Sequence, residues 1–367
     1  MKIICVAGTR PEAIKMAPVI LALQKNTTFN VRVLATAQHR QMLDQVFAVF
    51  GIVPDIDLDI MQPNQSLPTL TARLLLKLDE VLQAEQPDVV LAQGDTTTVM
   101  TVALACFYLR IPFGHIEAGL RTWDIENPFP EEMNRVIAGR LAKWHFAPTN
   151  SSRDNLLREN VAAEKIWVTG NTVIDALQSV SAQPLPLPFE LDAAKRLILV
   201  TAHRRENFGE PYREICRAVK YIADNNADVQ ILYPVHPNPN IQTTAYELLG
   251  GHSQIILCPP LDYLPFVAAM QRAYIILSDS GGVQEEAPAL GKPVLVLRCE
   301  TERPEAVDAG VVKLVGPQFD TIVRECQLLL DDGRAYKTVA RGVSPYGDGK
   351  SAERIHDILR EYAAQCA

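Results

Sequence analysis

Two glycines and two carboxylates follow an apolar run in the stretch SDSGGVQEEAP, residues 278–288. Glycine permits positive φ and close approach of a ligand, and N–H groups at a helix start bind anions such as a diphosphate. Glu286 would lie about one turn into that helix, where its carboxylate can accept two hydrogen bonds from a ribose diol. The pattern predicts a nucleoside diphosphate site at Ser280, Gly281, Gly282 and Glu286. The alternative is an ordinary turn with acids favoured by the helix dipole.

Basic side chains follow two other apolar runs. Arg10 and Lys15 bracket the start of the first predicted helix, where both can reach an anion. The surrounding GTRPEAIK matches neither the dinucleotide GxGxxG pattern nor a Walker loop. His203 and Arg204 follow the apolar run 197–201 and suit a phosphate leaving group. In both places the alternative is a solvated basic surface.

Three carboxylates stand where apolar runs end or helical patterns begin. Asp95 and Glu117 each follow a predicted strand, and Glu131 begins a helical pattern. Asp95 alone could be an N-cap, and Glu131 alone could serve the helix dipole. An apolar strand, however, seldom ends in a buried acid such as Glu117 without a function. Gathered in one site, the three would repel one another, which would raise the pKa of at least one and favour acid–base chemistry.

We predict no metal site. No histidine and carboxylate stand at ligand spacing on one predicted helix, and a glycine-rich helix start can hold phosphate without magnesium. The seven cysteines are scattered without a Cys-x-x-Cys pair. This pattern is typical of a reducing cytosol and of a protein without structural zinc.

Short apolar runs alternate with longer helical patterns along almost the whole chain, as in parallel sheets covered by helices on both faces. The proline-rich segment 181–188 can continue neither a helix nor a central strand. We therefore predict an α/β protein with two doubly wound Rossmann-like domains facing a central cleft. The expected parts are an N-terminal domain 1–180, a linker 181–195, a C-terminal domain 196–350 and a helix 351–367 that returns to the first domain. The predicted strands are 3–7, 31–37, 89–93, 113–116, 145–148, 166–169, 197–201, 230–234, 255–258, 274–278, 294–297 and 311–315.

Composition limits the class of protein. The 367 residues suffice for two domains, and 48% hydrophobic with 21% charged residues is typical of globular proteins. A formal charge of −8 without a basic block argues against nucleic acid or an anionic membrane as partner. The N-terminus does not resemble a signal peptide, and the longest apolar run, 102–109, is too short to span a bilayer. These features predict a cytoplasmic protein.

Taken together and in this order, the motifs resemble the non-hydrolysing UDP-N-acetylglucosamine 2-epimerases of bacteria. The matching stretches include GTRPEAIKMAPV, GDTTT, HIEAGLRT, PEEMNR, TAHRREN, PVHPNP, SDSGGVQEEAP and TERPEAV. The resemblance implies a fold of the GT-B glycosyltransferase type and a homodimer. It also implies interconversion of UDP-N-acetylglucosamine and UDP-N-acetylmannosamine by loss and re-addition of UDP through 2-acetamidoglucal, without nicotinamide, metal or other cofactor. The product would supply surface polysaccharide synthesis.

The same resemblance assigns residues. It implies catalytic roles for Asp95, Glu117, Glu131 and His203, and leaves open which carboxylate acts on which face of the sugar. The implied substrate contacts are Arg10, Lys15, Asp95, Glu117, His203, Phe266, Ser280, Gly281, Gly282, Glu286 and Arg303.

Some bacterial members of this family bind a second substrate molecule as an activator. The matching positions here are Gln38, Gln41, Arg204 and His236, but Asn64 stands where the activated members carry an arginine. Three rival functions remain at this point: a glycosyltransferase, a hydrolysing epimerase and a nucleotide-sugar sensor without activity.

Overall fold

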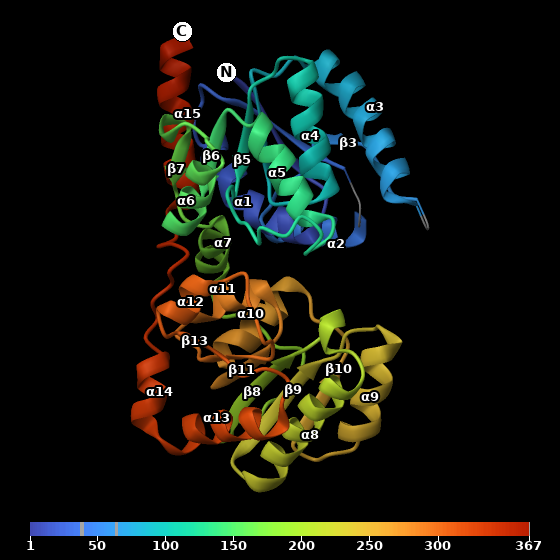
Figure 1. Ribbon diagram of the computed structural model, residues 1–367, viewed down its shortest axis with the longest axis vertical. Coiled ribbons are helices and arrows are strands. Elements are labelled where there is room, and N and C mark those ends of the chain that lie inside the picture. Colours follow the sequence, from blue (N-terminus) through green and yellow to red (C-terminus); the bar gives the residue numbers. More distant parts are fainter. Residues whose placement is uncertain (37–39, 63–64, 367) are drawn as a thin grey trace. The chain divides into compact units, whose positions relative to one another are not determined.

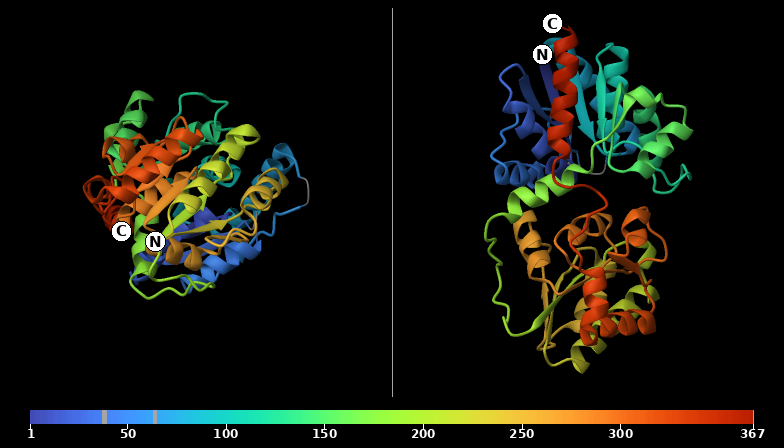
Figure 2. Two further views of the ribbon diagram at one scale, coloured as in Figure 1. Left: turned by 90° about the horizontal axis from the view of Figure 1, so that it is seen from below. Right: turned by 90° about the vertical axis from the view of Figure 1, so that its left-hand side faces the viewer.

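The computed structural model describes residues 1–36, 40–62 and 65–366. They form two compact units (Figures 1 and 2). The first unit comprises Met1–Ser179 together with the chain from Tyr346 onward, and the second comprises Val180–Pro345. Residues 182–195, which follow the last helix before the second sheet, contain no helix or strand.

Each unit is built on one parallel sheet (Figure 1). The first sheet has the order β3-β2-β1-β4-β5-β6-β7 and the second has the order β10-β9-β8-β11-β12-β13. The strands are β1 Lys2–Ala7, β2 Asn30–Ala35, β3 Ile56–Asp57, β4 Val89–Gln93, β5 Phe113–Ile116, β6 Trp144–Ala147, β7 Ile166–Val168, β8 Arg196–Thr201, β9 Val229–Pro234, β10 Ile255–Cys258, β11 Ile275–Ser278, β12 Val294–Val296 and β13 Val312–Leu314.

Helices alternate with these strands and cover the sheets. The helices of the first unit are α1 Arg10–Gln24, α2 Arg40–Val49, α3 Leu67–Glu85, α4 Thr97–Tyr108, α5 Glu131–Leu141, α6 Asn150–Arg158, α7 Thr172–Ser181 at the junction of the units, and α15 Ser351–Cys366. Those of the second unit are α8 Glu210–Asn225, α9 Pro239–Leu249, α10 Tyr263–Arg272, α11 Gly281–Ala289, α12 Pro304–Asp308, α13 Phe319–Asp331 and α14 Gly333–Val339. The two doubly wound units confirm the predicted α/β fold class.

The strand order reverses direction once in each sheet, between β1 and β4 and between β8 and β11. In open parallel sheets, ligands bind beyond the carboxyl ends of the strands at such a reversal. Four of the predicted site residues lie in the loops that follow these strands: Asp95 after β4, His203 and Arg204 after β8, and Ser280 after β11. The topology therefore gives each unit one edge where a ligand is expected.

Local sequence explains how these elements form. Every residue of β4 is buried, as expected for a central strand with helices on both faces. Helix α1 begins with a capping box, because the Thr9 side chain accepts from the N–H of Glu12 and the Glu12 carboxylate returns to the N–H of Thr9. Thr96 and Ser66 cap α4 and α3 through the side chain alone, which accepts the N–H of Val99 and of Thr69 respectively.

The C-terminal helix α15 packs on α1 in the first unit (Figure 2). Asp175 on α7 accepts the N–H of Ala352 at 2.8 Å, which satisfies a free donor in the first turn of α15. Near the other end of the helix, the Lys143 ammonium lies 4.0 Å from the ring centroid of Tyr362, and Trp144 meets that ring edge-on. These contacts fix the last helix to the sheet of the first unit.

Two differences from the predicted elements are local. The two-residue strand β3 was not predicted, and the predicted strand 31–37 ends at Ala35. No helix among the described residues is long and apolar enough to cross a membrane.

Candidate active site

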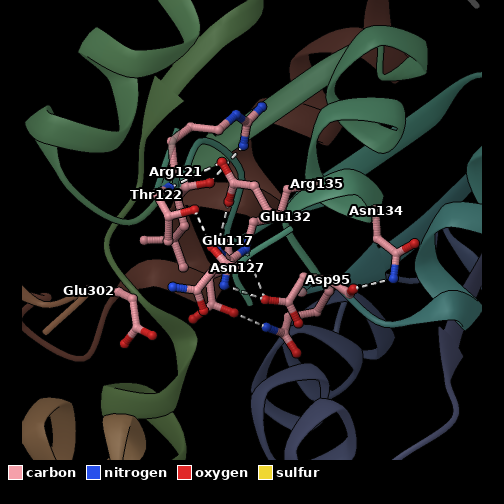
Figure 3. A network of polar contacts seen from close by, with 12 residues as sticks. Asp95, Glu117, Arg121, Thr122, Asn127, Glu132, Asn134, Arg135 and Glu302 are labelled. Atoms are coloured by element: carbon pink, nitrogen blue, oxygen red, sulfur yellow. Dashed lines mark hydrogen bonds and ion pairs between the residues drawn. The ribbon is translucent and has the colours of Figure 1, made fainter. Parts of the chain in front are cut away.

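Asp95, two residues beyond β4, is held by one arginine from α5. Arg135 donates to its Oδ2 twice, from Nε at 3.0 Å and from Nη2 at 2.7 Å (Figure 3). Asn134 donates from its side chain to the Asp95 carbonyl at 2.8 Å. Asp95 keeps 28% of its side chain exposed, whereas Arg135 keeps 8%. The buried guanidinium of Arg135 therefore fixes the partly exposed carboxylate of Asp95 beyond the carboxyl end of β4.

A second, buried carboxylate balances this arginine. Nη1 of Arg135 donates to Glu132 at 2.9 Å, and the other oxygen of Glu132 accepts the N–H groups of Thr122 at 3.1 Å and Trp123 at 3.2 Å (Figure 3). Burial works against the charged guanidinium, but Asp95 and Glu132 outweigh it and raise the pKa of Arg135. The loop before α5 is thus linked to Asp95 through two buried charges.

Glu117 follows β5 directly and adopts φ 64°, a left-handed conformation that non-glycine residues rarely take. Lys15 donates to it at 2.5 Å and Asn171 at 2.8 Å, and the Gln93 side chain donates to its other oxygen. Such a conformation persists where several contacts enforce it, and strained residues cluster at functional sites. Because β4 and β5 are neighbours in the sheet, Asp95 and Glu117 stand at adjacent strand ends.

The backbone N–H groups before α1 donate to Glu12, an acid of the same helix. Glu12 accepts the N–H groups of Gly8 at 2.6 Å and Thr9 at 2.8 Å, and the Thr96 hydroxyl donates to its other oxygen. Burial raises the pKa of Glu12, and these hydrogen bonds oppose the rise. The amides that would bind phosphate at this junction are taken, which explains why GTRPEAIK resembles no nucleotide-binding loop. Arg10 is the first residue of α1.

The structure separates the two adjacent acids of α5. Glu131 is the first helical residue and is half-buried, whereas Glu132 is buried and carries the contacts to Arg135. Sequence reasoning selected Glu131 and did not select Glu132 or Arg135. The buried side of a helix start cannot be identified from the two letters EE alone.

In the second unit, Ser280 is the N-cap of α11 and Gly281 and Gly282 form its first turn. Neither glycine has positive φ, so the conformational reason proposed for them is wrong. A Cβ on Gly281 would make only ordinary van der Waals contacts, 3.7 Å from Nη2 of Arg204 and 3.9 Å from Nη2 of Arg303, which places both guanidinium groups beside this helix start. A helix start flanked by two guanidinium groups is a favourable place for a diphosphate.

Further predicted residues lie around this helix start. Glu286 is buried on α11, and Phe266 lies on α10, half-buried. The guanidinium of Arg303 pairs with Glu285, which is buried and was not predicted as a site residue. A buried acid beside an arginine fixes the direction in which the guanidinium points.

His203 follows β8. In the sheet β8 is the neighbour of β11, the strand that precedes α11. The backbone N–H of His203 donates to Asp279 at 2.9 Å, and the His203 ring stacks on His236 with 5.5 Å between centroids. Arg204 also donates its N–H to Asp279, at 2.8 Å. Arg204 and His236, predicted as activator contacts, therefore lie beside His203. Of the other predicted activator positions, Gln41 lies on α2, whereas Gln38 and the departing Asn64 fall outside the described residues.

The carboxyl ends of the strands therefore carry different chemical groups in the first and the second unit. The first carries carboxylates held by cations, and the second carries a helix start with arginines and a histidine. Within residues 1–36, 40–62 and 65–366, no three His, Cys, Asp or Glu side chains gather as metal ligands would.

Comparison with known proteins gives consistent matches. The profile of the family described as UDP-N-acetylglucosamine 2-epimerase matches residues 21–360. The UDP-N-acetylglucosamine 2-epimerase of Salmonella typhimurium is 54% identical, over 99% of this chain and 99% of that protein. The crystal structure of the UDP-GlcNAc 2-epimerase from Neisseria meningitidis bound to UDP-GlcNAc is 48% identical, with a TM-score of 0.92 over 98% of this chain and 100% of that one.

A more distant structure, of Methanocaldococcus jannaschii UDP-GlcNAc 2-epimerase in complex with UDP-GlcNAc and UDP, is 34% identical. It superimposes with a TM-score of 0.81 over 98% of this chain and 100% of that one.

Proposed function

The chain belongs to the UDP-N-acetylglucosamine 2-epimerase family, and we propose that it interconverts UDP-N-acetylglucosamine and UDP-N-acetylmannosamine by elimination and re-addition of UDP. The observation that carries the proposal is the pair of acids at adjacent strand ends, Asp95 held by Arg135 and Glu117 held by Lys15. A transferase would need an acceptor and would not need these acids around the sugar.

In the proposed reaction, the bond between carbon 1 and the UDP oxygen breaks and its electron pair leaves with UDP. A carboxylate takes the proton from carbon 2, and the double bond of 2-acetamidoglucal forms. Re-addition delivers a proton to the opposite face of carbon 2 and restores the bond from carbon 1 to UDP. Because the hydrogen at carbon 2 is only weakly acidic, departure of UDP must run ahead, and carboxylates stabilise the resulting cation.

We propose that the second unit binds the UDP part. Backbone N–H groups at Ser280, Gly281 and Gly282 would hold the diphosphate and Glu286 the ribose. Arg303 and His203 would offset the charge that grows on the departing UDP. Lys15 and Arg10 on α1, and Glu117 and Asp95, are the further proposed substrate contacts. Glu131 and Phe266 complete the proposed contacts.

The setting of the reaction is also a proposal. We expect a cytoplasmic homodimer that supplies N-acetylmannosamine units for surface polysaccharide synthesis. Leu76 on α3 and Phe107 and Tyr108 on α4 are 67%, 60% and 64% exposed, and α3 packs on α4, which supports a protein interface that involves these two helices. Light scattering of wild type and Phe107→Ser would test this. A monomeric wild type would contradict it.

The experiment that tests the activity is product identification by NMR. Incubation with UDP-N-acetylglucosamine should yield UDP-N-acetylmannosamine and reach the same mixture from either sugar nucleotide. Accumulation of free sugar and UDP would indicate a hydrolysing enzyme instead. An unchanged substrate would leave only a transferase or a sensor.

A further inference from the structure

Asp279, at the carboxyl end of β11, is completely buried and organises the chain that follows β8. Its Oδ2 accepts the backbone N–H of His203 at 2.9 Å, that of Arg204 at 2.8 Å and the side-chain amide of Asn207 at 3.1 Å. One carboxylate oxygen therefore fixes the backbone on which His203 stands.

The other oxygen, Oδ1, is buried and has no hydrogen-bond partner among the described residues. It lies 3.6 Å from Nδ1 of His203. A buried charged oxygen without a donor is costly, and a small rotation of the imidazole would make Nδ1–H that donor. His203 keeps 40% of its side chain exposed, so with Nδ1 toward the buried acid, Nε2 points to the open side.

The remaining neighbours hold the ring in this place. His236 stacks against it nearly parallel, at 14° between ring planes. Tyr233 donates to the carbonyl of Ala202, the residue before His203, at 3.0 Å, and Tyr212 and Tyr233 share a hydrogen bond of 2.5 Å. Burial raises the pKa of both tyrosines, so they stay neutral. Asp279 is thus the acid that faces His203, and Arg204 and His236 are the basic groups.

We propose that Asp279 is a positioning residue for His203. Asp279 holds the imidazole with Nδ1–H toward Oδ1 and favours the doubly protonated ring, whose Nε2–H donates a hydrogen bond to the phosphate oxygen of the departing UDP. This rests on the proposed function. When the bond from carbon 1 breaks, its electron pair stays on the phosphate oxygen, and Nε2–H donates a hydrogen bond to that oxygen. Re-addition reverses the step.

Electrostatics supports the assignment. Partial burial lowers the pKa of His203, Asp279 raises it, and His236 and Arg204 lower it further. Without Asp279, only the lowering effects would remain. The doubly protonated ring would then exist only at lower pH, and activity that depends on it would be lost earlier as pH rises.

The test variant is Asp279→Asn, because asparagine has nearly the same size and shape as aspartate. The amide oxygen can accept the N–H groups of His203 and Arg204, which leaves the amide nitrogen as a donor facing Nδ1. The imidazole must then accept at Nδ1, so it stays neutral and donates to the phosphate oxygen from Nε2 without a positive charge. We expect kcat to fall about 10-fold, with little change in UDP affinity, since a hydrogen bond from a charged donor is about twice as strong as one from a neutral donor. The alkaline limb of the pH profile should move to lower pH.

The matched control is Asn207→Ser, which removes a hydrogen bond to the same buried oxygen without removing charge. It should leave the pH profile in place. A shift equal to that of Asp279→Asn, or an Asp279→Asn enzyme within twofold of wild type, would overturn the proposal.

Nitrogen-15 NMR of wild type gives an answer that does not depend on how the variant folds. His203, assigned by His203→Gln, should carry its proton on Nδ1 when neutral, and an Nε2–H tautomer would overturn the proposal. A wild type with the Nδ1–H tautomer but no epimerase activity would uphold the pairing and overturn only the proposed function.

Discussion

At the scale of single residues, two of the three candidate catalytic carboxylates, Asp95 and Glu117, are each held by a cation from a helix. Arg135 is 40 residues from Asp95 in the sequence, and Lys15 is 102 residues from Glu117. A carboxylate paired with a cation keeps one orientation, which proton exchange at carbon 2 requires.

Asp95→Asn and Glu117→Gln should each reduce turnover by about 10²–10⁴-fold, because an amide cannot accept the proton from carbon 2. UDP affinity should be largely unchanged, since the proposed UDP contacts belong to the second unit. Steady-state kinetics and UDP calorimetry measure both quantities. Glu80→Gln, in an exposed ion pair with Lys77, is the control and should be fully active. If UDP affinity collapsed together with activity, the assigned roles would be wrong.

Arg135→Gln should destabilise the first unit by about 3–5 kcal/mol, because Glu132 would remain buried without its cation. The three tryptophans, Trp123, Trp144 and Trp167, all belong to the first unit, so their fluorescence in urea reports its unfolding. Arg153→Gln, which breaks an exposed pair with Asp154, should cost no more than about 1 kcal/mol. Equal losses from both variants would show that the buried pair is not structural.

The sequence identified residue types at strand ends but not their partners. Asp95 and Glu117 stood out because each follows an apolar strand. Arg135, Asn171 and Asp279 did not, since their roles arise only when distant segments meet. The choice between Glu131 and Glu132 depends on the rotation of α5 about its axis, which short motifs do not reveal.

At the scale of elements, the turn after β5 sets the position of Glu117. Gly119 has φ +92°, and a Cβ there would collide with the carbonyl oxygen of Ser152. This glycine lets the turn pack on α6 while Glu117 faces the edge of the sheet.

Gly119→Ala should therefore destabilise the first unit by more than the roughly 1–2 kcal/mol expected for a left-handed alanine, and turnover should fall as Glu117 moves. Gly51→Ala is a matched control, since φ is +66° and nothing lies within 4 Å of the added Cβ. Urea unfolding of both variants gives the comparison. Identical losses would mean that Ser152 moves aside without cost.

Elements were predicted well where apolar runs are long. Each predicted strand overlaps an observed one, because continuous Val, Ile and Leu bounded by turn residues is a strong signal for a buried parallel strand. β3 has two residues, Ile56 and Asp57, and exists only through pairing with Leu34 and Ala35. No local pattern encodes such a strand. The domain and linker bounds remain predictions.

At the scale of the whole molecule, two buried histidines tie stability to pH. Burial lowers the pKa of His115 to about 4 and that of His145 to about 3. The unfolded chain would bind these protons near pH 6.5, whereas the folded protein would not. Their contribution is complete above about pH 6.5 and is lost as pH falls toward the folded values. Each should contribute a slope of about 1.4 kcal/mol per pH unit in this range.

His115→Gln should remove about half of that slope, since glutamine can still donate to the carbonyl of Gly94 without titrating. Urea unfolding between pH 5 and 8, followed by tryptophan fluorescence, measures it. The pKa of Glu12 is raised by burial, so Glu12 contributes a pH slope of opposite sign to the free energy of unfolding. Wild type and His115→Gln both contain Glu12, so its contribution cancels when their slopes are subtracted. His252→Gln in the second unit is the control. An unchanged slope in His115→Gln would contradict the account.

The central claim is that UDP leaves and returns while carboxylates exchange the hydrogen at carbon 2. Proton NMR of the wild-type reaction with UDP-N-acetylglucosamine in deuterated water tests it most directly. We predict UDP-N-acetylmannosamine with deuterium at carbon 2. A product that keeps its original hydrogen there would contradict the account.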